Sequence, residues 1–288
     1  MGFDIAALAL GAATGFGLSL VLTQLGLRHL SPLRGASISV PSTMVALLLL
    51  SPAALDTKSF DPTGALLFAV SGCLFPAVVT LLTFEANRRV GASISSALGN
   101  LSPLFAILIA FLVLREIPRP GQLVGLGVIL TGVALIVGAP RATNGQAFGF
   151  AIVLLLLAAF IRGLVQPIVK LGLTHWPSAY AATLISYIMS ATFILSVAAI
   201  REGSAIVTAW RKGWRWFIPV GLLNGLAVLA MYGALARGPV TVVAPLVACY
   251  PLATLAFSRL LLKSTSLAWG AAIGVAVTVA GVALLLRS

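Results

Sequence analysis

The chain has 288 residues, of which 60% are hydrophobic and 8% are charged, and its formal net charge is +12. Soluble domains carry roughly 25% charged residues, so this composition excludes a soluble globular protein and indicates an integral membrane protein. The Lys and Arg residues are scattered over short loops instead of being collected on one helix or tail, which argues against a nucleic-acid-binding role.

Apolar runs recur from one end of the chain to the other, and about 20 apolar residues allow a helix to cross a hydrocarbon core roughly 30 Å thick. The N-terminal stretch lacks a basic region and leads directly into the first run, so we expect a transmembrane helix there and not a cleaved signal peptide. The runs predict ten spans, near residues 3–25, 35–54, 62–84, 91–114, 120–139, 147–173, 177–200, 215–236, 239–262 and 267–287.

The longest polar connection, residues 201–217, joins the seventh and eighth predicted spans. It contains Trp210, Trp214 and Trp216 interleaved with Lys and Arg, a combination that is typical of the membrane interface. We therefore expect this connection to anchor the protein at one membrane edge.

The two halves of the sequence repeat each other. LGLRH at residues 25–29 reappears as LGLTH at residues 171–175, and Pro103 corresponds to Pro251. Glycines near the ends of the halves also correspond, with Gly121, Gly125 and Gly132 matched by Gly270, Gly274 and Gly281.

Each half contains five predicted spans, an odd number, so the second half must enter the membrane in the opposite sense. The sequence thus predicts an all-α integral membrane protein of ten transmembrane helices. These form two inverted five-helix repeats, residues 1–140 and 141–288. Secondary transporters typically have this arrangement, with the substrate near the membrane midplane between the halves.

Residues 91–138 carry a series of small residues, then Leu-x-Pro, then a Glu that closes the fourth span, then glycines in the fifth. This pattern, which residues 238–284 share in part, resembles the half-repeat of EamA-type proteins in the drug/metabolite transporter superfamily. The resemblance covers essentially all ten spans. It implies a bacterial inner-membrane exporter of amino acids or other small metabolites, with a central cavity lined by the first, third, fourth, sixth, eighth and ninth spans. Glu116 has no acidic partner in the second half, which favours a structural role for it near a helix end.

Arg162, Gln166 and Lys170 recur every four residues on the sixth predicted span and therefore share one helix face. Arg162 lies about 22 Å into this helix at 1.5 Å per residue, too deep to reach the interface easily. It therefore needs a partner, either the anionic group of a substrate or a protein acceptor such as Glu85 or the carbonyls freed by Pro167. We expect Lys170 to extend toward the interface.

Further polar residues in the spans are candidates for a mostly apolar substrate pocket but could equally hold helices together. The candidate substrate-binding residues are Arg162, Gln166, Asn100, Asn224 and Tyr250. Glu85 is a candidate for proton coupling, because a buried carboxylate can exchange a proton near neutral pH. Alternatively, Glu85 forms ion pairs with Arg88 and Arg89, three and four residues later.

We therefore expect a carrier that moves an amino acid or a similar zwitterion, in the export direction, by alternating access. An exporter of hydrophobic cations, an intramembrane enzyme, a channel and a structural membrane protein are the alternatives. We expect no catalytic residues because no HExxH or GxSxG motif occurs and His29 and His175 lie at span ends. A channel is disfavoured because Phe16 and Leu20 occupy the repeat positions of Arg162 and Gln166.

The expected partners are a small-molecule substrate and the lipid bilayer, and the protein is expected to be a monomer or a homodimer. No metal and no cofactor are expected, since Cys73 and Cys249 lie singly within apolar spans. The orientation of the termini stays open. The distribution of Lys and Arg favours termini outside the cell, whereas the family resemblance implies termini inside.

Overall fold

The computed structural model describes residues 3–137, 145–203 and 205–262, and then residues 270, 273, 274, 276–278, 280, 281 and 284. All regular elements within these residues are helical, as the sequence predicts. The first half contains α1 (Phe3–Gly26), α2 (Pro32–Ala54), α3 (Pro62–Gly72), the π-helical segment η1 (Cys73–Val78), α4 (Val79–Gly99), α5 (Ser102–Leu114) and α6 (Pro120–Val137). The second half contains α7 (Gly145–His175), α8 (Ala179–Glu202), α9 (Ala205–Arg237), α10 (Val240–Val247) and α11 (Tyr250–Leu262).

Seven helices in the described part of the chain are long and apolar enough to cross a membrane, and two shorter apolar helices accompany them. This protein is therefore a multi-pass membrane protein. The predicted count of ten spans is not confirmed. The third predicted span and the start of the fourth fall within one helical run, Pro62–Ser96, and most of the remainder of the fourth forms the shorter helix Ser102–Leu114. Most of the tenth lies outside the described residues.

Gly91 marks the boundary between the third and fourth predicted spans. Its φ of 78° and ψ of 170° interrupt α4, and glycine adopts a positive φ without the strain that a Cβ would bring. The next residue, Ala92, donates its backbone N–H to the Gln24 side chain at 3.1 Å. This bond ties the boundary to α1.

The connection expected at residues 201–217 is helical from Ala205 onward, so α9 is longer than the predicted eighth span. The polar residues expected at the membrane interface do not end the helix, because no proline occurs in it before Pro219. Trp216 stacks on His29, with ring centroids 5.7 Å apart, and Arg215 lies 5.4 Å from the ring centroid of Trp214. These contacts fit the expected interfacial anchor.

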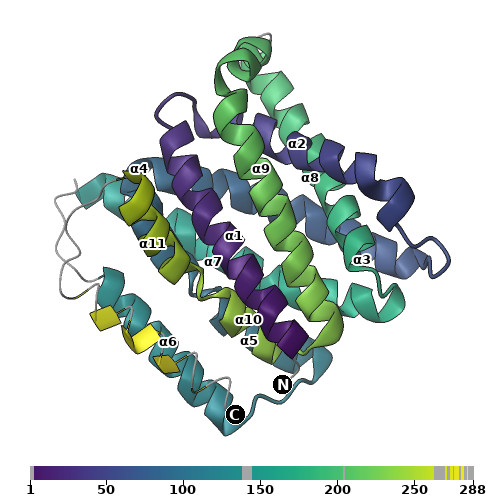
Figure 1. Ribbon diagram of the computed structural model, residues 1–288, viewed down its shortest axis with the longest axis vertical. Coiled ribbons are helices and arrows are strands. Elements are labelled where there is room, and N and C mark those ends of the chain that lie inside the picture. The colour runs from purple at the N-terminus through teal and green to yellow at the C-terminus, as the bar shows by residue number, and fades with distance from the viewer. Residues whose placement is uncertain are drawn as a thin grey trace.

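The helix packing follows the repeat. In Figure 1, α1 lies beside α9 and α11, and the contacts confirm both neighbours. The first helix of the second half, α7, packs against α4 and α5, which hold the corresponding places in the first half. The first helix of each half thus packs against helices of the other half, and the two halves form one body.

Corresponding elements approach each other closely at the end of the halves, where described residues of the last predicted span run along α6 (Figure 1). A Cβ added to Gly132 would lie 2.7 Å from the carbonyl oxygen of Gly274, and one added to Gly281 would lie 2.9 Å from that of Gly125. Gly132 and Gly281 are repeat partners, as are Gly125 and Gly274. One contact is therefore made twice, as a pseudo-twofold axis requires.

A helix break occurs at the same point of each half. In the first half, α4 ends at Gly99 and α5 begins at Ser102, and in the second half α10 ends at Val247 and α11 begins at Tyr250. Pro103 and Pro251 are the second residues of the new helices, where the missing N–H of proline costs no helical hydrogen bond. Discontinuous helices at corresponding positions are where transporters place their binding sites.

Candidate functional site

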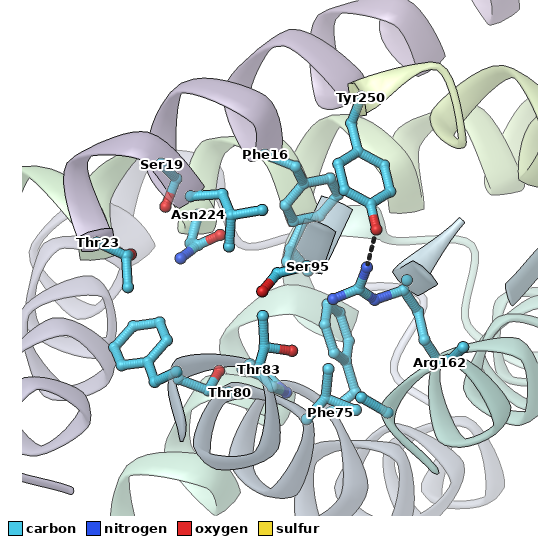
Figure 2. A pocket seen from close by; sticks show the side chains of 18 of the residues that line it. Phe16, Ser19, Thr23, Phe75, Thr80, Thr83, Ser95, Arg162, Asn224 and Tyr250 are labelled. Carbon is cyan, nitrogen blue, oxygen red and sulfur yellow. Dashed lines mark hydrogen bonds between the residues drawn. The ribbon is translucent and has the colours of Figure 1, made fainter. Parts of the chain in front are cut away.

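A pocket of about 640 Å³, including the part that is open to solvent, lies where α1, α4, α7, α9 and α11 meet. We call it the central pocket. Its walls come from both halves, and from the six spans that the family resemblance implies, with Tyr187 of α8 in addition. Figure 2 shows its labelled lining residues, which are Phe16, Ser19, Thr23, Phe75, Thr80, Thr83, Ser95, Arg162, Asn224 and Tyr250.

Arg162 points into one end of the central pocket (Figure 2), where its Nη1 donates a hydrogen bond of 3.4 Å to the Tyr250 hydroxyl. Three aromatic rings surround the guanidinium, with its central carbon 5.7 Å from the ring centroid of Tyr250, 5.8 Å from that of Phe75 and 6.0 Å from that of Phe16. The buried Nε has no hydrogen-bond partner within the described part of the chain. Most of the guanidinium's hydrogen-bonding capacity is therefore available to a bound molecule.

The other end of the central pocket is lined by hydroxyl and amide groups, which Figure 2 shows on Ser19, Thr23, Thr80, Thr83 and Asn224. Thr23 is buried, and its hydroxyl has no partner among the residues that the structure describes. The same holds for Ser95, which lies between the two ends. Buried polar groups are nearly always hydrogen-bonded, so these hydroxyls are suited to contact a molecule in the pocket.

Two of the predicted substrate-binding residues do not line the central pocket. Gln166 is buried one helical turn beyond Arg162 and donates to the Arg162 carbonyl at 3.5 Å. Asn100 is fully buried in the break between α4 and α5, and neither of its side-chain amide atoms has a partner in the described segments. The structure thus brings Arg162, Asn224 and Tyr250 together and leaves these two outside. Their substrate-binding roles stay predictions.

Glu85 lies outside the central pocket and forms ion pairs with Arg88 at 3.0 Å and with Arg89 at 2.6 Å. This is the helical spacing that the sequence offered as the alternative to proton exchange. Neither of the protein partners expected for Arg162 is found among the described residues. Glu85 contacts other arginines, and the one side-chain hydrogen bond from Arg162 within this part of the chain goes to Tyr250. Proton coupling through Glu85 stays a prediction.

Lys170 and Glu116 hold the turn between α9 and α10. The Lys170 ammonium donates to the carbonyl oxygens of Leu235 at 2.8 Å and Gly238 at 3.0 Å. The Glu116 carboxylate accepts the N–H of Thr241 at 3.1 Å. Each charge complements the helix end that it faces. Lys170 therefore caps a neighbouring helix, which the expectation of a simple interfacial side chain did not include.

Phe75, Thr80, Thr83 and Thr23 line the central pocket, although sequence reasoning did not select them. Aromatic and small hydroxyl residues are common wherever membrane helices pack, so their identities alone gave no signal. The position of Phe16 in the repeat did give a signal. Phe16 is the repeat partner of Arg162, and residues related by a twofold axis meet where they lie close to that axis.

Comparisons with known proteins agree with this architecture. The model of the EamA-like transporter family matches residues 5–138 and 149–287. Among solved structures, one described only as the crystal structure of a protein aligns with a TM-score of 0.70 and 15% sequence identity, covering 96% of this chain and 98% of that one. This likeness concerns the fold alone. No curated protein matches the sequence.

Proposed function

Because this chain belongs to the EamA-like transporter family, we propose that it is a secondary transporter that moves a small organic metabolite by alternating access. The family match falls on two segments of similar length, and the contacts between α6 and the last predicted span have twofold character. A carrier built from two such halves has two related packings, and these expose one site to either side of the membrane in turn.

The observation that carries the proposal is the position of Arg162. Its guanidinium lies in a pocket between the halves, beside the helix break that ends at Tyr250, and it forms no ion pair with any described residue. Ionisable residues within membrane spans are rare and mark substrate pathways. The planar fork of arginine matches the two oxygens of a carboxylate.

An amino acid or a similar zwitterion is the substrate class that we propose. Its carboxylate would bind Arg162, and its remaining polar groups would bind the hydroxyl and amide wall that includes Thr23 and Asn224. We propose that the protein resides in a bacterial inner membrane, as a monomer or a homodimer, and that its physiological direction is export.

The test is counterflow uptake of labelled amino acids into proteoliposomes that contain the wild type, Arg162→Ala or Arg88→Ala. We expect the wild type to accumulate at least one amino acid, because a carrier exchanges labelled for unlabelled substrate. Loss of hydrogen bonds to a charged group is worth about 1.5–3 kcal/mol, so Arg162→Ala should lower uptake at subsaturating substrate by roughly 10- to 100-fold.

Arg88→Ala is the matched control, because Arg88 lies outside the central pocket and Glu85 keeps its ion pair with Arg89. It should transport as the wild type does. Absence of counterflow for every amino acid would contradict the proposed substrate class. Undiminished uptake by a folded Arg162→Ala protein would contradict the role given to Arg162.

A further inference from the structure

The carboxylates of this chain all lie away from the central pocket. The sequence has six Asp and Glu residues, and each of them falls within the described residues. Three have partners that account for them, since Glu85 pairs with Arg88 and Arg89, Glu116 caps α10, and Glu202 pairs with Arg34. The other three, Asp4, Asp56 and Asp61, lie in the first turn of α1 and in the connection before α3.

Among the described residues that line the central pocket, Arg162 is the one that is charged. The segments outside the described part contain no Asp or Glu. The pocket thus has a fixed charge of one sign. Aromatic rings on Phe16, Phe75 and Tyr250 surround this charge, and charges interact more strongly there than in water.

The wall opposite Arg162 has hydrogen-bonding groups without charge. Ser19, Thr23, Thr80, Thr83 and Asn224 offer hydroxyl and amide groups (Figure 2), each of which can both donate and accept. A hydroxyl group on a ligand finds both hydrogen-bond donors and acceptors on such a wall. An ammonium group would find acceptors there but no opposite charge.

We infer that the central pocket takes a monoanion, a single carboxylate carried on a skeleton with neutral hydrogen-bonding groups, and that it rejects cations. This inference rests on the proposed function and narrows its substrate class. An amino acid enters this site by virtue of its carboxylate, and its 2-amino group is recognised no better than a 2-hydroxyl group. An exporter of hydrophobic cations, an alternative that the sequence left open, does not fit this pocket.

The test compares three compounds on one carbon skeleton, which are an amino acid, the 2-hydroxy acid and the amino alcohol. We would use leucine, 2-hydroxyisocaproate and leucinol, and in a second series serine, glycerate and serinol. Binding to the full-length protein in detergent is measured by titration calorimetry at constant ionic strength. The proteins are the wild type, Arg162→Gln, Arg162→Lys and, as the matched control, Arg88→Gln.

In the wild type we expect at least one hydroxy acid to bind as tightly as its amino acid or tighter, and the amino alcohol to bind at least about 30-fold more weakly, because a cation near Arg162 is repelled. Arg162→Gln should reduce the difference between acid and amino alcohol to about threefold or less. Arg88→Gln should keep the wild-type order. Arg162→Lys keeps the charge without the planar fork, so it should bind acids more weakly while still rejecting amino alcohols. If Arg162→Gln does not fold, this variant tests the role of the charge.

An amino alcohol that binds the wild type as tightly as the acids would overturn the inference, and so would discrimination that persists in Arg162→Gln. Binding of none of the six compounds would also contradict it. The two proposals can fail separately. Binding of hydroxy acids without any counterflow would support the inference and contradict the proposed transport. Counterflow of cations alone would support transport and contradict the inference.

Discussion

Arg162 is held inside the protein by weak contacts instead of an acid. Placing an arginine at the centre of a span costs about 2.5–3.5 kcal/mol on insertion scales. Three cation–π contacts near the 6 Å limit contribute roughly 0.5 kcal/mol each, and the long bond to Tyr250 contributes about 1.5 kcal/mol. These terms roughly offset the cost of insertion. The guanidinium is therefore tolerated without an ion pair, which leaves it able to bind a ligand.

The Tyr250 hydroxyl both accepts from Arg162 and has its own proton available for a bound anion. Tyr250→Phe keeps the ring but removes both interactions. The affinity for 2-hydroxyisocaproate should fall by about 3- to 10-fold, the effect of one hydrogen bond of roughly 0.5–1.5 kcal/mol, as measured by titration calorimetry. Tyr180→Phe is the control, because its hydroxyl donates to the Leu47 carbonyl and it does not line the pocket. Equal affinities in all three proteins would remove Tyr250 from the site.

Sequence reasoning found the charged end of the pocket more readily than its other walls. Arg162 was identified because a charged side chain within an apolar span is costly and needs a partner. Gln166 shares its helix face, but the pocket does not extend along that face beyond Arg162. Asn100 lies in a helix break that was not predicted, because residues 91–114 read as one continuous apolar span.

Among whole elements, the interface between α6 and the last predicted span depends on the absence of side chains. The glycines that correspond between the two halves lie at this interface, where the described residues have backbones within reach of each other. Close approach through small residues is a common way for membrane helices to associate. The breaks before Ser102 and Tyr250 were not predicted, although Pro103 and Pro251 marked them in hindsight.

Gly132→Ala tests this interface, with Gly127→Ala on the same helix as the matched control. A Cβ on Gly132 would lie 2.7 Å from the Gly274 carbonyl oxygen, whereas nothing lies within 4 Å of one on Gly127. Overpacking should make Gly132→Ala less stable by about 1–3 kcal/mol. Gly127→Ala should be neutral or more stable by up to about 1 kcal/mol. Denaturant unfolding in detergent measures both, and equal effects of the two substitutions would contradict the close approach.

For the molecule as a whole, the pseudo-twofold relation places one pocket between the two halves, as the proposed alternating access requires. The central pocket draws its walls from both halves, and Phe16 and Arg162 meet there as repeat partners. The two positions have diverged, so the binding site is asymmetric although the scaffold is not. Fold class and family were predictable from the repeat, whereas the neutral far wall required the three-dimensional arrangement of α1, α4 and α9.

The central claim is that the pocket at Arg162 opens to each side of the membrane in turn. Ser95 tests it most directly, because it is buried in this pocket and Ser95→Cys changes one atom. Cys73 and Cys249, the two native cysteines, are first replaced by alanine. A membrane-impermeant thiol reagent is then applied to oriented vesicles from either side, with and without 2-hydroxyisocaproate.

We expect Ser95→Cys to be labelled from both sides and the hydroxy acid to slow labelling from each. Labelling from one side alone, whether or not the anion is present, would contradict alternating access through this pocket.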